Sequence, residues 1–494
     1  MNKRKSGVLL HITSLPGDEG IGTLGKEAFL FIDFLKESSQ KLWQILPLGP
    51  AGAGNSPYQC YSAFAGNPLM IDLDLLVDEE LISAESLNER PSFVKKRSDF
   101  LKVESWKLPI LEKSFKTFKT VLFEKLKYEY WKFLDEHAWW LNDHALFMAT
   151  RGHFDNVSWN KWPQPIKFRE EEALKNLASE LSDEIEFHKY LQFLFFRQWH
   201  RLKAYANQQG IEIIGDVPLY ISGESSDIWA NTDIFILDEE LQPIQVGGVP
   251  PDYFSETGQL WGNPVFNWSR LEERDYDWWL ARLHFNLRMF DRVRIDHFRG
   301  LESFWSIPAA EKTAINGSWI PAHGHKLLSK LKQHLGELLF IAEDLGIITP
   351  EVDQLREDFN LPGMKVLQFA FTTDATNKDL PHNYSANCVV YTGTHDNDTT
   401  LGWLNSVVGE EKELLEKYTG EPAGKQLTKV VEMAIASVAE TAIFPLQDIL
   451  ELDTTARMNT PGTPSGNWEW RFQWKQLKVA QKKQLSELTL KYNR

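Results

Sequence analysis

Eight short apolar runs constrain the fold of this chain more than any other feature of its sequence. They cover residues 8–12, 42–46, 211–215, 292–296, 339–343, 364–369, 388–392 and 441–445. The runs are continuously apolar rather than alternating, as is typical of strands that are buried on both faces in a parallel sheet. Helical patterns separate many of them, for example at 25–38 and at 184–209, where Gly210 follows as a stop signal. The pattern predicts an α/β protein built as a (β/α)8 TIM barrel.

The spacing of the runs predicts one barrel domain over residues 1–494 with two insertions at the C-terminal face. A long stretch separates the second run from the third, and 127–150 within it has the 3.6-residue period of an amphipathic helix. We therefore predict a mostly helical inserted subdomain at 70–185. Residues 218–271 are rich in glycine, proline and aromatic residues. They follow the third strand, so we expect a loop-rich insertion over the active site.

Charge and composition exclude several classes of function. The chain has 53 basic and 69 acidic residues, a net charge of −16, so nucleic acid and anionic membrane surfaces are not expected partners. No apolar stretch approaches the ~20 residues that a membrane span needs. The apolar run near the N-terminus is too short for a signal peptide, and the chain has only two cysteines. Together these features predict a cytoplasmic protein; its oligomeric state is left open.

Two motifs that suggest a cofactor or a metal lack residues that such sites need. Residues 49–56 form a glycine-rich loop after a strand, but Asn55 stands where a phosphate-binding loop needs its lysine. His323 and His325 lie among turn residues and lack the partners and spacing of a metal site. We therefore predict neither a cofactor nor a metal.

Four acidic residues lie at the ends of predicted strands: Asp216, Asp296, Glu343 and Asp396. A single acid in such a place most often caps a helix or forms a turn. Four at one rim of a barrel point instead to a site, because barrel enzymes place their chemistry there. Arg294 precedes Asp296 by two residues, so both side chains point the same way. We expect this cation to keep Asp296 ionised, as a nucleophile requires.

These segments also resemble a known family. Arg294-Ile-Asp-His297, Ile341-Ala-Glu-Asp344, His395-Asp-Asn397 and Gly215-Asp-Val-Pro218 resemble four signature regions of the α-amylase clan. Further segments resemble glycoside hydrolase family 77, the 4-α-glucanotransferases: Ser56-Pro-Tyr58-Gln, Ser62-Ala-Phe-Ala-Gly-Asn-Pro, Gly248-Val-Pro-Pro-Asp-Tyr-Phe, Gly262-Asn-Pro, Tyr391-Thr-Gly-Thr-His-Asp-Asn-Asp-Thr and Asn459-Thr-Pro-Gly-Thr. They extend from Ser56 to Thr463, across most of the chain.

The resemblance implies roles for the acids. Asp296 becomes the nucleophile, Glu343 the general acid and base, and Asp396 a stabiliser of the transition state. A retaining mechanism needs two carboxyls about 5–5.5 Å apart, and its acid must hold a proton, so the pKa of Glu343 should be raised. Substrate binding is expected of Arg294, His395, His297, Asp216, Tyr58, Ser56, Gln259, Trp261 and Asn467. His297 directly follows Asp296, and successive side chains of a strand point to opposite faces, so His297 should point away from Asp296 unless the strand has already ended.

The implied activity is the transfer of α-1,4-glucan segments. They move from a donor malto-oligosaccharide to the 4-hydroxyl of an acceptor glucan or glucose, through a covalent glycosyl-enzyme. Residues 247–258 are a candidate lid, and 460–467 a loop opposite it, which would favour an acceptor sugar over water. An α-amylase-like hydrolase with the same acids is the alternative. The second alternative is a non-catalytic protein that binds glucans with some of the 19 tryptophans.

Overall fold

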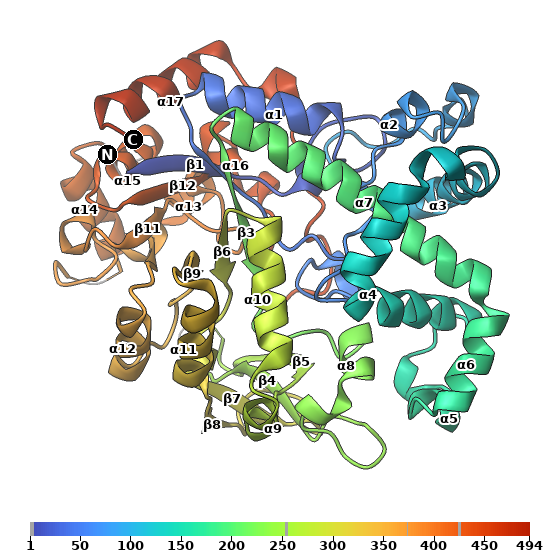
Figure 1. Cartoon of the computed structure of the whole chain (residues 1–494). Coiled ribbons are helices and arrows are strands. Elements are labelled where there is room, and N and C mark those ends of the chain that lie inside the picture. The colour runs from blue at the N-terminus through green and yellow to red at the C-terminus, as the bar shows by residue number, and fades with distance from the viewer. Residues whose placement is uncertain (1–3, 252–254, 373, 423–425) are drawn as a thin grey trace.

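A closed barrel of eight parallel strands forms the centre of the computed structural model, which describes residues 4–251, 255–372, 374–422 and 426–494 (Figure 1). The order around the barrel is β1-β12-β11-β10-β9-β6-β3-β2. The strands are β1 Lys5–Leu9, β2 Leu42–Gln44, β3 Glu212–Val217, β6 Arg292–Ile295, β9 Phe340–Ala342, β10 Gly363–Val366, β11 Cys388–Tyr391 and β12 Thr441–Pro445. Each predicted run overlaps one of these strands, so the predicted TIM barrel is confirmed.

Helices surround this barrel. α1 (Lys26–Glu37) follows β1, and α7 (Ser182–Gln208) leads into β3 through Gly210, whose φ of 76° is left-handed and favours glycine. The other helices outside the two insertions are α10 Asp277–Met289, α11 Gly324–Leu335, α12 Pro350–Asp358, α13 Thr400–Ser406, α14 Gly409–Thr419, α15 Leu427–Ala436, α16 Leu446–Ile449 and α17 Val479–Lys491. β1 and the C-terminal residue lie close together (Figure 1), and the Arg494 guanidinium donates to the carbonyl of Lys5 at 3.2 Å. Within the described ranges, no helix is both long and apolar enough to cross a membrane.

The stretch predicted as a helical subdomain gathers on one side of the barrel (Figure 1). It contains α2 Leu73–Asp78, α3 Phe100–Thr117, α4 Phe123–His153, α5 Gln164–Lys167 and α6 Glu171–Glu180. A single π-helical turn, Phe118–Leu122, joins α3 to α4. Aromatic side chains pack α4 against α7, for example Tyr130 against Phe193 with 5.2 Å between ring centroids. Because α7 begins inside the stretch and ends at the barrel, the boundary at residue 185 stays a prediction.

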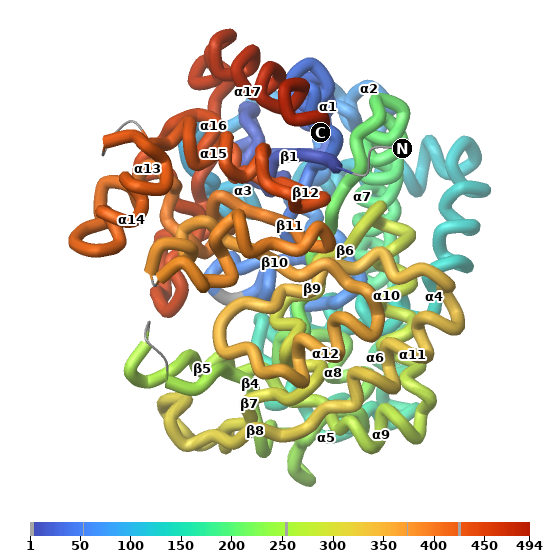
Figure 2. Tube along the Cα trace, turned by 90° about the vertical axis from the view of Figure 1, so that its left-hand side faces the viewer, coloured from blue at the N-terminus to red at the C-terminus, as the bar shows by residue number. Residues whose placement is uncertain are grey.

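The insertion predicted at 218–271 holds more regular structure than its composition suggests. It contains α8 Ser226–Ala230, β4 Gln245–Val249, β5 Gln259–Pro264 and α9 Trp268–Glu273. β4 and β5 join β7 (Ser303–Pro308) and β8 (Ser318–Pro321) in an antiparallel sheet of order β5-β4-β7-β8, to one side of the barrel (Figure 2). Residues 252–254 of the candidate lid lie outside the described residues.

Apolar side chains fill the barrel interior and form a layer directly below the rim that carries the acids. The buried residues inside are Leu9, Leu42, Leu46, Ile214, Ile341, Met364, Val366, Val389, Tyr391 and Ile443. Arg294 lies on top of this layer, with its Nε 3.4 Å from the sulfur of Met364. The guanidinium is therefore held between an apolar floor and the acids at the rim.

Candidate active site

Strand register brings three of the four predicted acids together. β3 pairs with β6, and β6 pairs with β9, so Asp216, Asp296 and Glu343 come from three adjacent strands. Asp216 lies in β3 opposite Arg294, whereas Asp296 and Glu343 directly follow β6 and β9. Asp396 reaches the same rim from the loop after β11. Its charge acts on Asp296 and raises the pKa of that carboxyl.

Arg294 bridges two of the carboxylates. Its Nη1 lies 2.8 Å from both oxygens of Asp216, and its Nη2 lies 2.9 Å from Oδ1 of Asp296. Asp216 also accepts a hydrogen bond of 2.6 Å from the hydroxyl of Tyr58. The predicted pairing of Arg294 with Asp296 is confirmed, but the cation divides its charge between two partners.

This division changes the electrostatics of Asp296. Burial raises the pKa of Asp296 above its ordinary value; Arg294 lowers it, and Asp216 and Asp396 raise it again. The net direction is upward. Arg294 therefore lowers the pKa of Asp296, as expected, but desolvation and two neighbouring carboxylates outweigh one shared guanidinium.

Glu343 has no such cation bound to it in the described part of the chain. Its Oε2 accepts the backbone N–H of His297 at 2.6 Å, and its Oε1 accepts the N–H of Leu345 at 3.0 Å. Burial raises the pKa of Glu343; Arg294 lowers it from a distance, and the charge of Asp296 raises it. Because the guanidinium bonds Asp296 directly, a proton shared by the pair resides on Glu343. The raised pKa predicted for Glu343 is confirmed in direction.

His297 lies at the site although alternation predicted that it would turn away. β6 ends at Ile295, and His297 adopts a left-handed backbone with φ of 51°, so the period-two argument no longer applies. Its ring meets Trp261 edge-on at 4.9 Å between centroids and lies 6.4 Å from Tyr220. Burial lowers the pKa of His297 to about 3, so its ring is neutral at physiological pH. A wall of aromatic rings results beside Glu343.

A second aromatic wall forms around His395. Its ring stacks on Tyr58 at 5.2 Å with 16° between the planes, and Trp468 lies 5.8 Å from it. Burial lowers the pKa of His395, which favours its neutral form. Tyr58 and His395 are predicted site residues, whereas sequence reasoning missed Trp468. Its only signal was its place next to Asn467, which was predicted.

Asp396 is held by a segment far away in the sequence. The Asn459 amide donates to its Oδ1 at 2.6 Å, and an Arg457 Nη2 donates to its backbone carbonyl at 2.6 Å. The backbone N–H of Asn459 also donates to the carbonyl of His395 at 3.1 Å. Sequence reasoning assigned no role to Asn459, although it stands in one of the segments that resemble family 77.

Comparison with known proteins agrees with this geometry. Residues 10–478 match the family described as 4-alpha-glucanotransferase, glycoside hydrolase family 77. The chain belongs to this family. It is 49% identical over 476 residues to the 4-alpha-glucanotransferase of Thermus thermophilus, covering 95% of this chain and 94% of that one. It is 48% identical over 498 residues to the 4-alpha-glucanotransferase of Synechocystis, covering 100% of this chain and 99% of that one. The amylomaltase of Streptococcus agalactiae, solved in complex with acarbose, matches with a TM-score of 0.97 at 42% identity and 99% coverage of both chains.

The remaining predicted residues of this family 77 chain lie around the acids rather than on them. The Ser56 hydroxyl accepts the N–H of Tyr58 at 3.3 Å and so shapes the loop that carries Tyr58. Gln259 accepts the indole N–H of Trp261 at 3.2 Å, which orients that ring. The Asn467 amide bonds its own loop, accepting from Thr460 at 2.9 Å and donating to the carbonyl of Thr463 at 3.1 Å. These contacts position the walls of the site.

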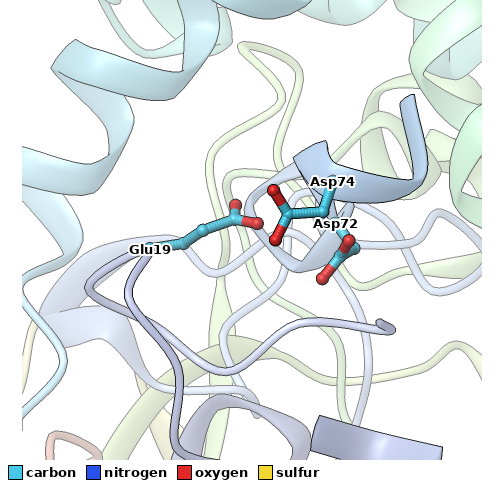
Figure 3. A group of neighbouring side chains, drawn as sticks. All are labelled: Glu19, Asp72 and Asp74. Atoms are coloured by element: carbon cyan, nitrogen blue, oxygen red, sulfur yellow. The ribbon is translucent and has the colours of Figure 1, made fainter. Parts of the chain in front are cut away.

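One carboxylate group outside the site is compact enough to suggest a metal ion. In the described ranges it consists of Glu19, Asp72 and Asp74 (Figure 3). Each buried member already has a partner: Glu19 pairs with Lys107 at 2.6 Å, and Asp72 caps α2 by accepting the N–H of Leu75 at 3.0 Å. Lys107 is itself fully buried, so a cation of the protein already pairs with the buried Glu19. The cluster is an ion pair beside a helix cap and gives no reason to invoke a metal.

Proposed function

We propose that the protein is a 4-α-glucanotransferase. It moves α-1,4-glucan segments from a donor malto-oligosaccharide to the 4-hydroxyl of an acceptor glucan or glucose, with retention at the anomeric carbon. The observation that carries the proposal is the asymmetry of the carboxyl pair: Arg294 bonds Asp296 at 2.9 Å, whereas Glu343 has only backbone donors among the described residues. Family membership supports the choice of substrate.

In the proposed mechanism, Asp296 attacks the anomeric carbon as Glu343 gives its proton to the leaving glycosidic oxygen. The donor's reducing-end fragment leaves, and the glucosyl segment stays on Asp296 as an ester. Glu343 then takes the proton of an acceptor 4-hydroxyl, whose oxygen displaces Asp296 and forms the new bond. The two displacements invert the anomeric carbon twice, so the α-configuration is retained.

Asp396 is proposed to stabilise both transition states through the sugar hydroxyls. The hydrogen bond from Asn459 fixes its carboxylate, which suits a group that must be in place before charge develops. Substrate contacts are proposed for Tyr58, Ser56, Asp216, Arg294, His395 and Asn467. They are also proposed for Gln259, Trp261 and His297, at the other aromatic wall.

Transfer rather than hydrolysis requires that an acceptor sugar reach the ester before water does. The candidate lid at 247–258 begins in β4, and its Gly247 leaves room for Tyr220: a Cβ there would lie 2.6 Å from that ring. On the opposite side, Asn467 ties the loop 460–467 to itself. Both contacts support walls that an acceptor can fill, and so favour transferase over an α-amylase-like hydrolase.

Incubation with maltotriose tests the reaction class. A transferase yields glucose and a ladder of longer oligomers, whereas short hydrolysis products alone would refute the proposal. Glu343→Gln should abolish the ladder because no proton reaches the leaving oxygen. Glu351→Gln is the matched control, since it makes the same change at an exposed residue of the next helix, α12, and should leave the ladder intact.

We also propose that the protein works in the cytoplasm. Both of its cysteines, Cys60 and Cys388, are free thiols, which suits a reducing compartment.

A further inference from the structure

Exposed aromatic side chains are rare in this protein, and they cluster. The chain has 19 tryptophans, 13 tyrosines and 30 phenylalanines. Within the described ranges, four of these side chains are exposed: Tyr128 (78%), Trp131 (54%), Trp139 (50%) and Phe168 (41%). Three of the four belong to α4, whereas Phe168 stands apart at the end of α5. Clustered exposed rings of this kind mark binding surfaces more often than chance exposure does.

The three rings lie on one face of α4. At 3.6 residues per turn, Tyr128, Trp131 and Trp139 fall within an arc of about 80°, and the row is about 16 Å long. Asp135 and Asn142 are exposed on the same arc, so polar groups alternate with the rings. The opposite side of the helix is buried by Tyr130, Phe133, His137, Trp140 and Leu141. Core packing therefore accounts for the second set of residues but not for the exposure of Tyr128, Trp131 and Trp139, the α4 aromatic face.

Neighbouring side chains hold two of these rings in place. Trp131 meets Phe123 edge-on at 5.8 Å, and the ammonium of Lys127 lies 6.0 Å from its centroid. Trp139 meets Phe64 edge-on at 4.7 Å. Rings fixed in this way lose little entropy when a ligand stacks on them.

The chemistry of this face favours a neutral sugar chain over other ligands. A pyranose ring has an apolar face of C–H groups that packs on an aromatic plane, and its hydroxyls can bond carboxylate and amide groups such as Asp135 and Asn142. Charges of both signs flank the face, since Lys132 and Glu136 are 3.9 Å apart, so it has no strong field for an ionic ligand. The net charge of −16 further disfavours nucleic acid and anionic lipid.

One buried ring links the α4 aromatic face to the candidate active site. Phe64, which supports Trp139, lines a cavity together with Tyr58 and Asp216. The loop from Ser56 to Gly66 thus connects Tyr58 at the acids with Trp139 on α4. Figure 1 shows α4 beside the barrel, where a glucan held on its outer face could extend beyond the site that cleaves it.

We propose that the α4 aromatic face binds a linear α-1,4-glucan outside the active site. Its ligand class follows from the proposed function, since the same polymer would be donor and acceptor. Long glucans would be held by this face while one end is processed, whereas maltotriose is too short to use both sites.

Electrophoresis in native gels with and without soluble amylose tests this proposal. The double variant Tyr128→Ala/Trp131→Ala should bind amylose at least about tenfold more weakly than wild type, a change of about 1.4 kcal/mol. Its turnover of maltotriose should stay within about twofold of wild type. Phe168→Ala is the matched control, because it removes an exposed aromatic ring away from α4 and should leave amylose binding unchanged.

Three outcomes overturn the proposal. One is unchanged amylose binding in the double variant. Another is an equal loss in Phe168→Ala. The third is a wild-type dimer in light scattering that the double variant does not form, which would make the face a contact between two copies of the chain. If stacking is the cause, a variant with Trp131→Phe in place of Trp131→Ala keeps a ring on the helix and should bind more amylose than the double variant does. A wild-type protein that fails to extend maltotriose would refute the proposed reaction. The amylose measurement would still test the binding face, because it does not depend on turnover.

Discussion

Asn459 offers the sharpest test of how the third carboxylate works. Its amide donates to Oδ1 of Asp396 at 2.6 Å, so Asn459→Asp replaces a donor with a second carboxylate at nearly the same place. Two unit charges 4 Å apart repel by about 1 kcal/mol in water and by about 4 kcal/mol in a protein-like medium. The side chain of Asp396 is 45% exposed, which places the cost between these limits. Repulsion of this size favours the pair with one proton over the pair with two charges, so the pKa of the added carboxyl should lie above that of a free aspartate.

The consequence is a pH-dependent defect. Above the raised pKa, the two carboxylates repel and Asp396 leaves its position, so the ratio of variant to wild-type kcat is low. Below it, the new carboxyl is protonated and donates an O–H to Asp396 as the amide did, so the ratio recovers. Asn459→Ala loses only the donor; a hydrogen bond to a charged group contributes about 1.5–3 kcal/mol, which predicts a loss of about ten- to a hundredfold at every pH.

Initial rates of maltotriose disproportionation from pH 5 to 9, each divided by the wild-type rate at the same pH, measure this effect. Dividing by the wild-type rate removes the part of the pH profile that both enzymes share. A flat ratio for Asn459→Asp, or an Asn459→Ala variant within twofold of wild type, would show that Asn459 does not position Asp396.

Three further changes test the packing that supports the site. Lys107→Met should lower the free energy of unfolding in urea by about 3–5 kcal/mol, because it leaves Glu19 buried without its cation; Glu19→Gln in the same chain should recover part of the loss. Gly66→Ala should cost about 1–3 kcal/mol by the same measurement, since its Cβ would lie 2.0 Å from the ring of Phe195. Burial lowers the pKa of His144 to about 3 from its ordinary 6.5, so neutral His144 stabilises the fold above pH 6.5 and this stability is lost as pH falls. The loss is about 2 kcal/mol by pH 5, and His144→Phe should lose less stability than wild type over that interval in thermal melts.

The barrel and its acids could be predicted because local pattern determines both. A continuously apolar run becomes a parallel strand, and the residue at its end falls on the rim whatever the rest of the chain does. Asp216, Asp296 and Glu343 follow this rule within one residue of a strand end. The sheet of β4, β5, β7 and β8 escaped prediction because glycines and prolines obscure its strands. Gly247 is needed there for the close approach of Tyr220.

Contacts between distant segments could not be predicted in the same way. Asn459 reaches Asp396 across 63 residues, and no periodicity links the two positions. Trp468 likewise joins the wall at His395 only because the loop before it folds back over the rim. The sequence placed Arg294 beside Asp296, but only the register of β3 with β6 showed that Asp216 shares the guanidinium.

That shared cation explains how one site can hold two carboxyls in different protonation states. Four carboxyl groups and one guanidinium gather at the rim, so the unliganded site has an excess of negative charge that binding a proton relieves. The proton is least costly on the group without a cation, which is Glu343. Had Arg294 bonded Glu343 and left Asp296 to backbone donors, the same residues would have produced a protonated nucleophile and an ionised acid, which cannot start the reaction. The direction in which one arginine reaches therefore assigns the roles that the acids alone leave undecided.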